Sequence, residues 1–409
     1  MKNLGMIPKL LIAIVLGIVV GQLTFLPDIV FELIMTVSGL FSKVLNFILP
    51  LMVIAFIVGG IIRLTTNAGK MLGLTLGIAF ASLLFAAALA FVTGQAIFPS
   101  FISSVSTSFG EGSGIEPLFE FGIEPFFTVA EATVFAFIIG IAISYINSKG
   151  KGETIRKVFV DYQEVISTVI SGFILPCIPF YVFSNFMNMS YAGSVAEVFS
   201  VFAPVYLLII VQHFVYILIT YGLSASVNKV SFVGMIKNAI PAYLTAFGTQ
   251  SSAASIPTSI KAARNNNVDE EVAEFAMPLT ATTHLPGSMI SVTNIVLAVV
   301  MLTGGDSSVA AMLPFYLTLA LALVAAPGVP GGAIMTALPY IGMVGLPLEG
   351  AIPSLLITLY LTQDSFGTAI NVSGDQHIAQ YVQKYYKSKQ KDRADKKVKK
   401  EKPVQSELN

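Results

Sequence analysis

Four polar residues stand at helical spacing in the otherwise small or apolar segment LTQDSFGTAINVSGD, residues 361–375. They are Asp364, Thr368, Asn371 and Asp375, at i, i+4, i+7 and i+11, so a helix would present all four on one face. Two acidic groups on one stripe of a membrane helix are costly and persist only where they face water, a ligand or an ion. We therefore interpret the stripe as half of a solute-binding site.

The elements that position this stripe are expected to lie in a membrane. Of the 409 residues, 55% are hydrophobic and 11% are charged, whereas a soluble domain carries about a quarter charged residues. The single cysteine, Cys177, excludes disulfide scaffolds and multi-cysteine metal sites. The composition predicts an integral membrane protein.

Lysine and arginine are segregated along the chain and set the expected topology. The positive-inside rule assigns to the cytoplasm the basic segments 149–157, 229–237, 261–264 and 384–402. The acidic loops 110–124 and 304–307 are expected outside, and Lys43 is the one base that fits this scheme poorly. We expect a multi-pass protein of the cell inner (plasma) membrane with both termini cytoplasmic.

Apolar stretches of bilayer-spanning length, roughly 20 residues each, precede the stripe. They lie at about 8–25, 32–62, 71–98, 124–146, 160–187 and 197–224, with an outer Ser/Gly/Pro-rich loop at 99–123. Two later apolar segments are broken at their centres. The segment 230–263 is interrupted by GTQSSAASIP and carries Lys at both ends, which predicts a re-entrant hairpin entered from the cytoplasm.

The second broken segment, about 308–342, is interrupted by APGVPGG and predicts a hairpin entered from outside. Between the hairpins, the span 272–303 contains HLPGS, where Pro286 and Gly287 should unwind the helix. The final span, about 351–382, holds the polar stripe.

This order of hairpins and spans is an inverted repeat, which indicates a transporter binding site near the midplane. Irregular backbone at that depth must line a cavity, because lipid cannot satisfy its hydrogen bonds. The alternative is two kinked structural helices. The predicted fold class is all-α integral membrane, with eight transmembrane helices plus two re-entrant helical hairpins.

Four motifs carry a resemblance to a known family. TQSSAASIP, MPLTATTHLPGS, GVPGGAI and QDSFGTAINVSGD occur in order over about residues 245–376. They resemble the hairpins and last two spans of the dicarboxylate/amino acid:cation symporter family, which includes the glutamate transporters; the second-hairpin motif is one residue short. The resemblance implies a scaffold plus a mobile transport domain, assembled as a homotrimer and working by an elevator motion.

The resemblance also divides the chain. It implies scaffold and trimerisation helices at 1–70, a transport-domain helix at 71–98, an outer loop with scaffold and transport helices at 99–228, a core transport domain at 229–383 and a basic disordered cytoplasmic tail at 384–409. The expected partners are a small-molecule amino acid and membrane lipid, and no nucleic acid.

Roles for single residues follow from the same resemblance. Asp364 would bind the amino group of the substrate, and Asn371 its carboxylate, helped by main-chain N–H groups of Ser251 and Ser252. Further substrate contacts are implied at Ser288, Val329, Pro330, Gly331 and Thr368.

The implied cargo ion is sodium, with a proton instead of it or beside it. Asp375 would be the carboxylate ligand of one sodium site. Main-chain oxygens of Thr280, His284 and Asn371 would complete that site, and a second sodium site would use Thr282 and Ala326.

Departures from the family pattern bear on the substrate. Gly367 and Gln250 stand where members that carry acidic substrates have Arg, and no Lys or Arg lies between 265 and 383. A second substrate carboxylate would need a cation, so a small neutral amino acid is expected, as in the serine/threonine branch, with Gly367 leaving room for its side chain.

A further departure concerns the ions. Pro286 replaces the buried Asp of the family's third sodium site, and the polar positions that complete it fall on Leu83, Ala86 and Ala87. That site is expected to be absent.

His284 leaves two interpretations open: a proton carrier that replaces an ion, or a neutral hydrogen-bonding substitute for Asn. His213 and His377 are expected to be structural. A membrane enzyme is disfavoured because no protease motif is present and the two acids of the stripe stand roughly 16 Å apart at helical rise. An ion channel is disfavoured as well, because its pore would show rings of repeated polar residues.

We therefore predict a secondary active transporter, sodium-coupled, for a small neutral amino acid such as serine or threonine. The alternative is proton-coupled symport of an amino acid or dicarboxylate, with His284 as the proton carrier.

Overall fold

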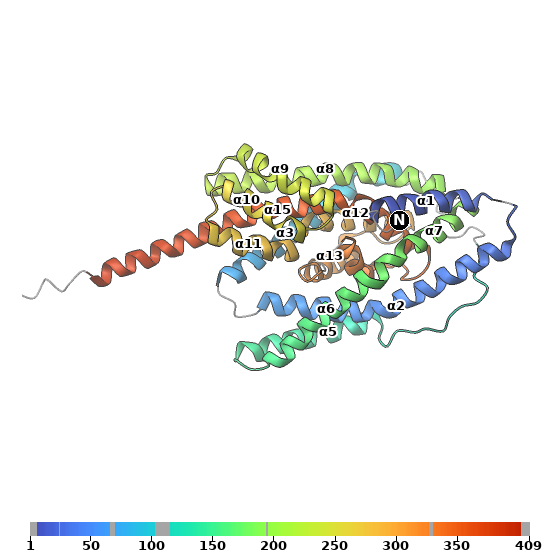
Figure 1. The fold of residues 1–409 in the computed structure, drawn as a ribbon, viewed down its shortest axis with the longest axis horizontal. Helices are drawn as coiled ribbons and strands as arrows, with labels where there is room; N and C mark the ends of the chain where they lie inside the picture. Colours follow the sequence, from blue (N-terminus) through green and yellow to red (C-terminus); the bar gives the residue numbers. More distant parts are fainter. Residues whose placement is uncertain are drawn as a thin grey trace, which may run out of the picture.

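The computed structural model describes residues 6–23, 25–65, 70–102, 115–193, 195–326 and 330–401, and over these ranges the chain forms helices and no strand (Figure 1). The first half contains α1 (Met6–Gly21), α2 (Asp28–Thr65), α3 (Lys70–Ile97), α4 (Pro99–Ile102), α5 (Val129–Ser148), α6 (Glu153–Val169), the π-helical turn η1 (Ile170–Ile174), α7 (Leu175–Tyr191) and α8 (Val195–Asn228). The second half contains α9 (Phe232–Thr249), η2 (Ala253–Ser255), α10 (Ile256–Asn265), α11 (Glu270–Thr283), α12 (Pro286–Leu302), α13 (Val309–Leu323), α14 (Gly332–Ala337), η3 (Leu338–Val344) and α15 (Ala351–Glu401).

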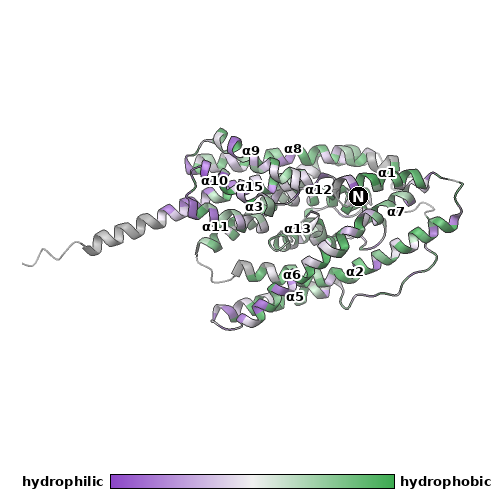
Figure 2. Cartoon of the chain, in the orientation of Figure 1, coloured by the Kyte–Doolittle hydropathy of each residue, from purple (hydrophilic) through white to green (hydrophobic). Residues whose placement is uncertain are grey.

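Several helical stretches in the described ranges are long and apolar enough to cross a membrane. They are Asp28–Gly59, Met71–Ile102, Glu153–Tyr191, Ser200–Asn228 and Glu270–Leu302. Figure 2 shows hydrophobic residues along the long helices, and hydrophilic residues gathered at the end from which the last helix leaves the bundle. The chain is built as a multi-pass membrane protein, while the count of eight spans stays a prediction.

The helices pack as two groups. In what we call the support group, α1 runs along α7, and α2 runs along α5 and α6. In the core group, α12 packs against α3, α8 and α15, while α15 also packs against α9 and α11. Figure 1 shows α2, α5 and α6 on one side of the molecule and α8 and α9 on the other. Nearly every residue of α12 is buried, as expected for a helix that is apolar all round.

The three predicted interruptions are confirmed. α9 ends at Thr249, after which Gln250 takes a left-handed conformation with φ of 53°. Between α11 and α12 the backbone of His284 is extended, and Pro286 begins the new helix, a position where its missing N–H is not needed. α13 ends at Leu323, and α14 begins after Gly331.

The basic tail differs from the prediction. We expected disorder from residue 384, but α15 continues as a helix to Glu401. The tail is rich in Lys and has no Gly or Pro before residue 403, and lysine favours helix. A preceding helix also removes the cost of nucleation.

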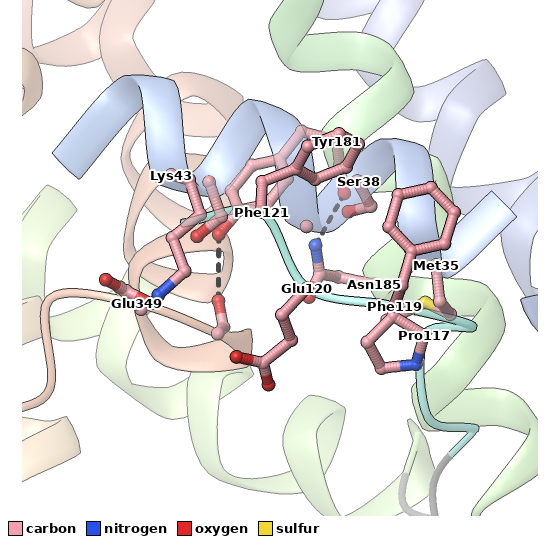
Figure 3. Close-up of a pocket in the computed structure, with 13 residues that line it drawn as sticks. Met35, Ser38, Lys43, Pro117, Phe119, Glu120, Phe121, Tyr181, Asn185 and Glu349 are labelled. Atoms are coloured by element: carbon pink, nitrogen blue, oxygen red, sulfur yellow. Dashed lines mark hydrogen bonds and ion pairs between the residues drawn. The ribbon is translucent and has the colours of Figure 1, made fainter. Parts of the chain in front are cut away.

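Lys43, the base that fitted the charge pattern poorly, joins the two groups (Figure 3). Its Nζ lies 2.8 Å from Oε2 of Glu349, in the connection between η3 and α15. The Asn46 side chain donates to the other oxygen of that carboxylate at 2.6 Å, and the Tyr181 hydroxyl donates to the main-chain oxygen of Gly350 at 2.8 Å. These contacts lie beside a pocket lined by α2, α7 and residues 117–121.

Candidate functional site

α15 carries the predicted stripe into the middle of the core group. Asp364, Thr368, Asn371 and Asp375 are all buried, none more than 6% exposed. The opposite side of the helix packs through Ala369 and Val372 against α9. The helical spacing in the sequence therefore predicted the shared, enclosed face correctly.

Asp364 is held by the second hairpin. The main-chain N–H of Gly331 donates to its Oδ2 at 2.8 Å, and the Thr368 hydroxyl donates to its Oδ1 at 3.3 Å. Gly331 has a φ of 75°, and a Cβ there would come within 2.7 Å of the Leu361 side chain. This contact with the carboxylate thus requires glycine, both for the left-handed backbone and for the close packing.

Asn371 and Ser288 bond each other twice. The Ser288 N–H donates to Oδ1 of Asn371 at 3.1 Å, and Nδ2 of Asn371 donates to the Ser288 hydroxyl at 2.9 Å. The hydroxyl of Tyr360 donates to the same serine oxygen at 2.8 Å. The break before α12 exposes the serine N–H, because the first N–H groups of a helix have no partner within it.

Asp375 is bonded to the side chain of His284, whose main-chain oxygen is a predicted ligand of the same sodium site. Nδ1 of His284 lies 2.9 Å from Oδ1 of Asp375. Nε2 of His284 lies 3.1 Å from the Ser82 hydroxyl and 3.3 Å from the Tyr216 hydroxyl. The imidazole thus bridges the carboxylate to two hydroxyl groups on α3 and α8.

The main-chain oxygen of Thr280, another predicted sodium ligand, accepts from the His284 N–H at 2.9 Å, so it closes the last turn of α11. Leu83, Ala86 and Ala87, which stand at the positions expected to complete the family's third sodium site, are buried apolar residues. Ser82, directly beside them, supplies the hydroxyl group on α3.

Other predicted site residues make no hydrogen bond to the stripe within the described ranges. No hydrogen bond among the described residues joins Ser251 or Ser252 to α15, and none joins Thr282 to Ala326. Pro330 lies half-buried beside Gly331. Val329 lies outside the described residues.

α12 packs beside Gly367 of α15. A Cβ at Gly367 would stand 3.6 Å from Ser291 Oγ and from the carbonyl carbon of Gly287. In the reverse direction, a Cβ at Gly287 would come within 2.3 Å of the Gly367 oxygen. The close approach of the two helices thus depends on Gly287, whereas a Cβ at Gly367 would make only ordinary contacts, and space for a substrate side chain at this position stays a prediction.

Three residues of the site were not predicted: Tyr360, Ser82 and Tyr216. Tyr360 precedes Asp364 by four residues, so the helical spacing that defined the stripe would have included it. Ser82 and Tyr216 come from distant helices, and no spacing in the sequence links them to His284.

The whole chain was compared with known proteins. Residues 6–385 match the model of the sodium:dicarboxylate symporter family. A serine/threonine transporter, SstT, of Acinetobacter baylyi is 25% identical over 391 residues, which cover 91% of this chain and 95% of that protein.

Two animal proteins match over shorter stretches. The putative sodium-dependent excitatory amino acid transporter glt-4 of Caenorhabditis elegans is 29% identical over 59% of this chain, and excitatory amino acid transporter 1 of Rattus norvegicus is 25% identical over 66%. The matched region spans about half the length of each of these relatives, 48% and 49%. From the match across almost its entire length, the chain belongs to the sodium:dicarboxylate symporter family, whose members are transporters and not enzymes.

Proposed function

We propose that this protein is a secondary active transporter of the plasma membrane that couples sodium to the uptake of a small neutral amino acid such as serine or threonine. The observation that carries the proposal is the buried carboxylate of Asp364, which meets a main-chain N–H of the second hairpin at 2.8 Å. A buried carboxylate is a ready partner for an ammonium group. No Lys or Arg between 265 and 383 is available for a second substrate carboxylate.

Substrate binding in this proposal exchanges contacts already present. The ammonium group replaces the Gly331 N–H at Asp364, and the substrate carboxylate competes with Ser288 for Asn371. Sodium competes with His284 for Asp375. Main-chain N–H groups of Ser251 and Ser252 in the first hairpin also bind the substrate carboxylate. The core group, loaded with substrate and sodium, then moves against the support group as an elevator within a homotrimer.

Uptake into liposomes tests the proposal. The purified protein would be supplied with labelled serine, threonine or aspartate under a sodium gradient alone and then under a proton gradient alone. Serine or threonine uptake driven by sodium is the expected result. Sodium-driven uptake of aspartate but not of serine or threonine would contradict the assignment.

A second candidate is proton-coupled transport of an amino acid or dicarboxylate with His284 as the proton carrier. The observation that favours it is the direct contact of His284 with Asp375 at 2.9 Å, because an imidazole bonded to a carboxylate can take up and release a proton. In the same experiment, uptake driven only by the proton gradient, and lost in His284→Asn, would select this mechanism.

A further inference from the structure

One buried side chain of the support group reaches the interrupted part of the second hairpin. Nε2 of Gln163, on α6, donates to the main-chain oxygen of Ala325 at 2.5 Å. Gln163 is only 6% exposed. Ala325 directly precedes Ala326, whose oxygen is a proposed sodium ligand, so the contact lies at the edge of the proposed site.

The Ala325 oxygen needs a partner because its helix has ended. α13 stops at Leu323, and the two N–H groups that follow turn back to the helix, from Ala325 to Ala322 at 3.0 Å and from Ala326 to Leu323 at 3.2 Å. The last carbonyl groups of a helix have no N–H partner within it. Inside a membrane protein such a group must be satisfied by protein or by a water-filled cavity.

The packing around Gln163 fits this contact. A Cβ at Gly59 of α2 would lie 2.4 Å from Oε1 of Gln163 and 3.6 Å from the Cβ of Ala325. Glycine at position 59 is therefore what allows the glutamine to reach the end of α13. Oε1 of Gln163 is buried without a hydrogen-bond partner among the described residues, so the amide serves Ala325 through its donor.

We propose that Gln163 is a positioning residue that fixes the end of α13 against the support group. It thereby sets the place of the Ala326 oxygen, and its loss weakens sodium binding more than it slows turnover. The transport part of this inference rests on the proposed function, whereas the anchoring part does not.

The first test measures anchoring directly. Gln163→Met keeps the side-chain length but removes the donor. Amide hydrogen exchange of residues 318–326, followed by mass spectrometry on the protein in nanodiscs, should become about 5–10-fold faster, the factor expected for one lost hydrogen bond. Exchange equal to the wild-type rate would overturn the inference, whatever the uptake assay shows.

The second test measures transport. In sodium-driven serine uptake, Gln163→Met should raise the half-saturating sodium concentration several-fold and change the maximal rate by less. Equal changes in both, or a change in the maximal rate alone, would contradict the positioning role. If the wild-type protein shows no sodium-driven uptake while exchange in the variant is faster, the proposed function fails and the anchoring stands.

A matched control is available in the core group. Nε2 of Gln380 donates to the main-chain oxygen of Asn266 at 2.7 Å, and Gln380 is 2% exposed. Gln380→Met removes the same kind of bond far from α13 and should leave exchange at 318–326 and the sodium dependence unchanged; a sodium shift as large as that of Gln163→Met would contradict the inference.

Gly59→Ala disturbs the same contact from the other side. It should reproduce the faster exchange, and the double variant Gly59→Ala/Gln163→Met should show less than the sum of the two effects. Full additivity would mean that the two positions do not act through one contact.

Discussion

The two hairpins approach α15 differently. The first is bound to that helix through amides that lie beyond the stripe, since Gln376 donates to the Ser259 oxygen at 3.1 Å and Gln380 donates to the Asn266 oxygen. Among the described residues, the hydrogen bonds of its tip residue Ser251 all lie within the hairpin, to Thr249, Ala254 and Ser255. The second hairpin instead touches a carboxylate of the stripe itself, through Gly331.

Their surroundings differ as well. α9 and α10 pack on α15, α11 and α8, all within the core group, whereas α13, α14 and η3 also pack against α2 of the support group. The first hairpin thus packs within the core group, whereas the second packs against both groups. Events at the stripe can therefore reach the support group through the second hairpin, and also through α15 itself, which packs against α1 and α7.

Removing the charge that the second hairpin contacts should have the largest effect. Asp364→Asn is expected to abolish amino-acid binding, because the amide offers no charge to an ammonium group, while the protein still folds. Isothermal titration with serine and a thermal unfolding curve would measure the two properties. Asp306→Asn, which alters an exposed acid in the loop between α12 and α13, is the control and should bind as the wild type does. Wild-type affinity in Asp364→Asn would refute the assigned role.

Neutralising Asp375, the carboxylate of the stripe nearer the first hairpin, should weaken sodium binding. Asp375→Asn is expected to raise the half-saturating sodium concentration about 10–100-fold, the range for one lost bond to a charged group. Uptake at graded sodium concentrations would measure it. Unchanged sodium dependence would place the cation elsewhere.

Gly331→Ala tests the contact of the second hairpin with Asp364 by changing the backbone that makes it. A left-handed conformation costs a residue other than glycine about 1–2 kcal/mol, and here the added Cβ also meets Leu361 at 2.7 Å. We expect a lower thermal unfolding temperature and tighter substrate binding, because the ammonium group would no longer have to displace the Gly331 N–H from Asp364. Gly350→Ala, at a φ of 85° with no atom within 4 Å of the new Cβ, is the matched control and should lower stability only. Equal binding in both variants would argue against a role for the Gly331 contact.

The ion pair between Lys43 and Glu349 should have the smallest effect. Its side chains are 22% and 39% exposed, and such pairs contribute about 0.2–1 kcal/mol. A double-mutant cycle with Lys43→Met and Glu349→Gln, measured as the rate of uptake at low and high salt, should give a coupling energy in that range that falls at high salt. A salt-independent coupling would show that the pair acts through packing.

The sequence predicted those parts of the site that depend on local periodicity. The stripe on α15 and the breaks at 248–257, HLPGS and 326–332 follow from helical spacing and from Gly and Pro positions. The partners of the stripe could not be predicted in this way. Ser82 and Tyr216 reach His284 only because α3, α8 and α11 pack together, and the contact between Gly287 and Gly367 depends on the distance between two helices.

That contact has an evolutionary consequence. Where the backbones of α12 and α15 touch, a side chain at position 287 can be accommodated only if α12 moves away, because its Cβ would come within 2.3 Å of the Gly367 oxygen. Replacing Gly287 would therefore require an earlier change that separates the two helices. Position 287 is thus constrained against single substitutions, whereas position 367, where an added Cβ would stand 3.6 Å from its nearest neighbours, is freer to vary.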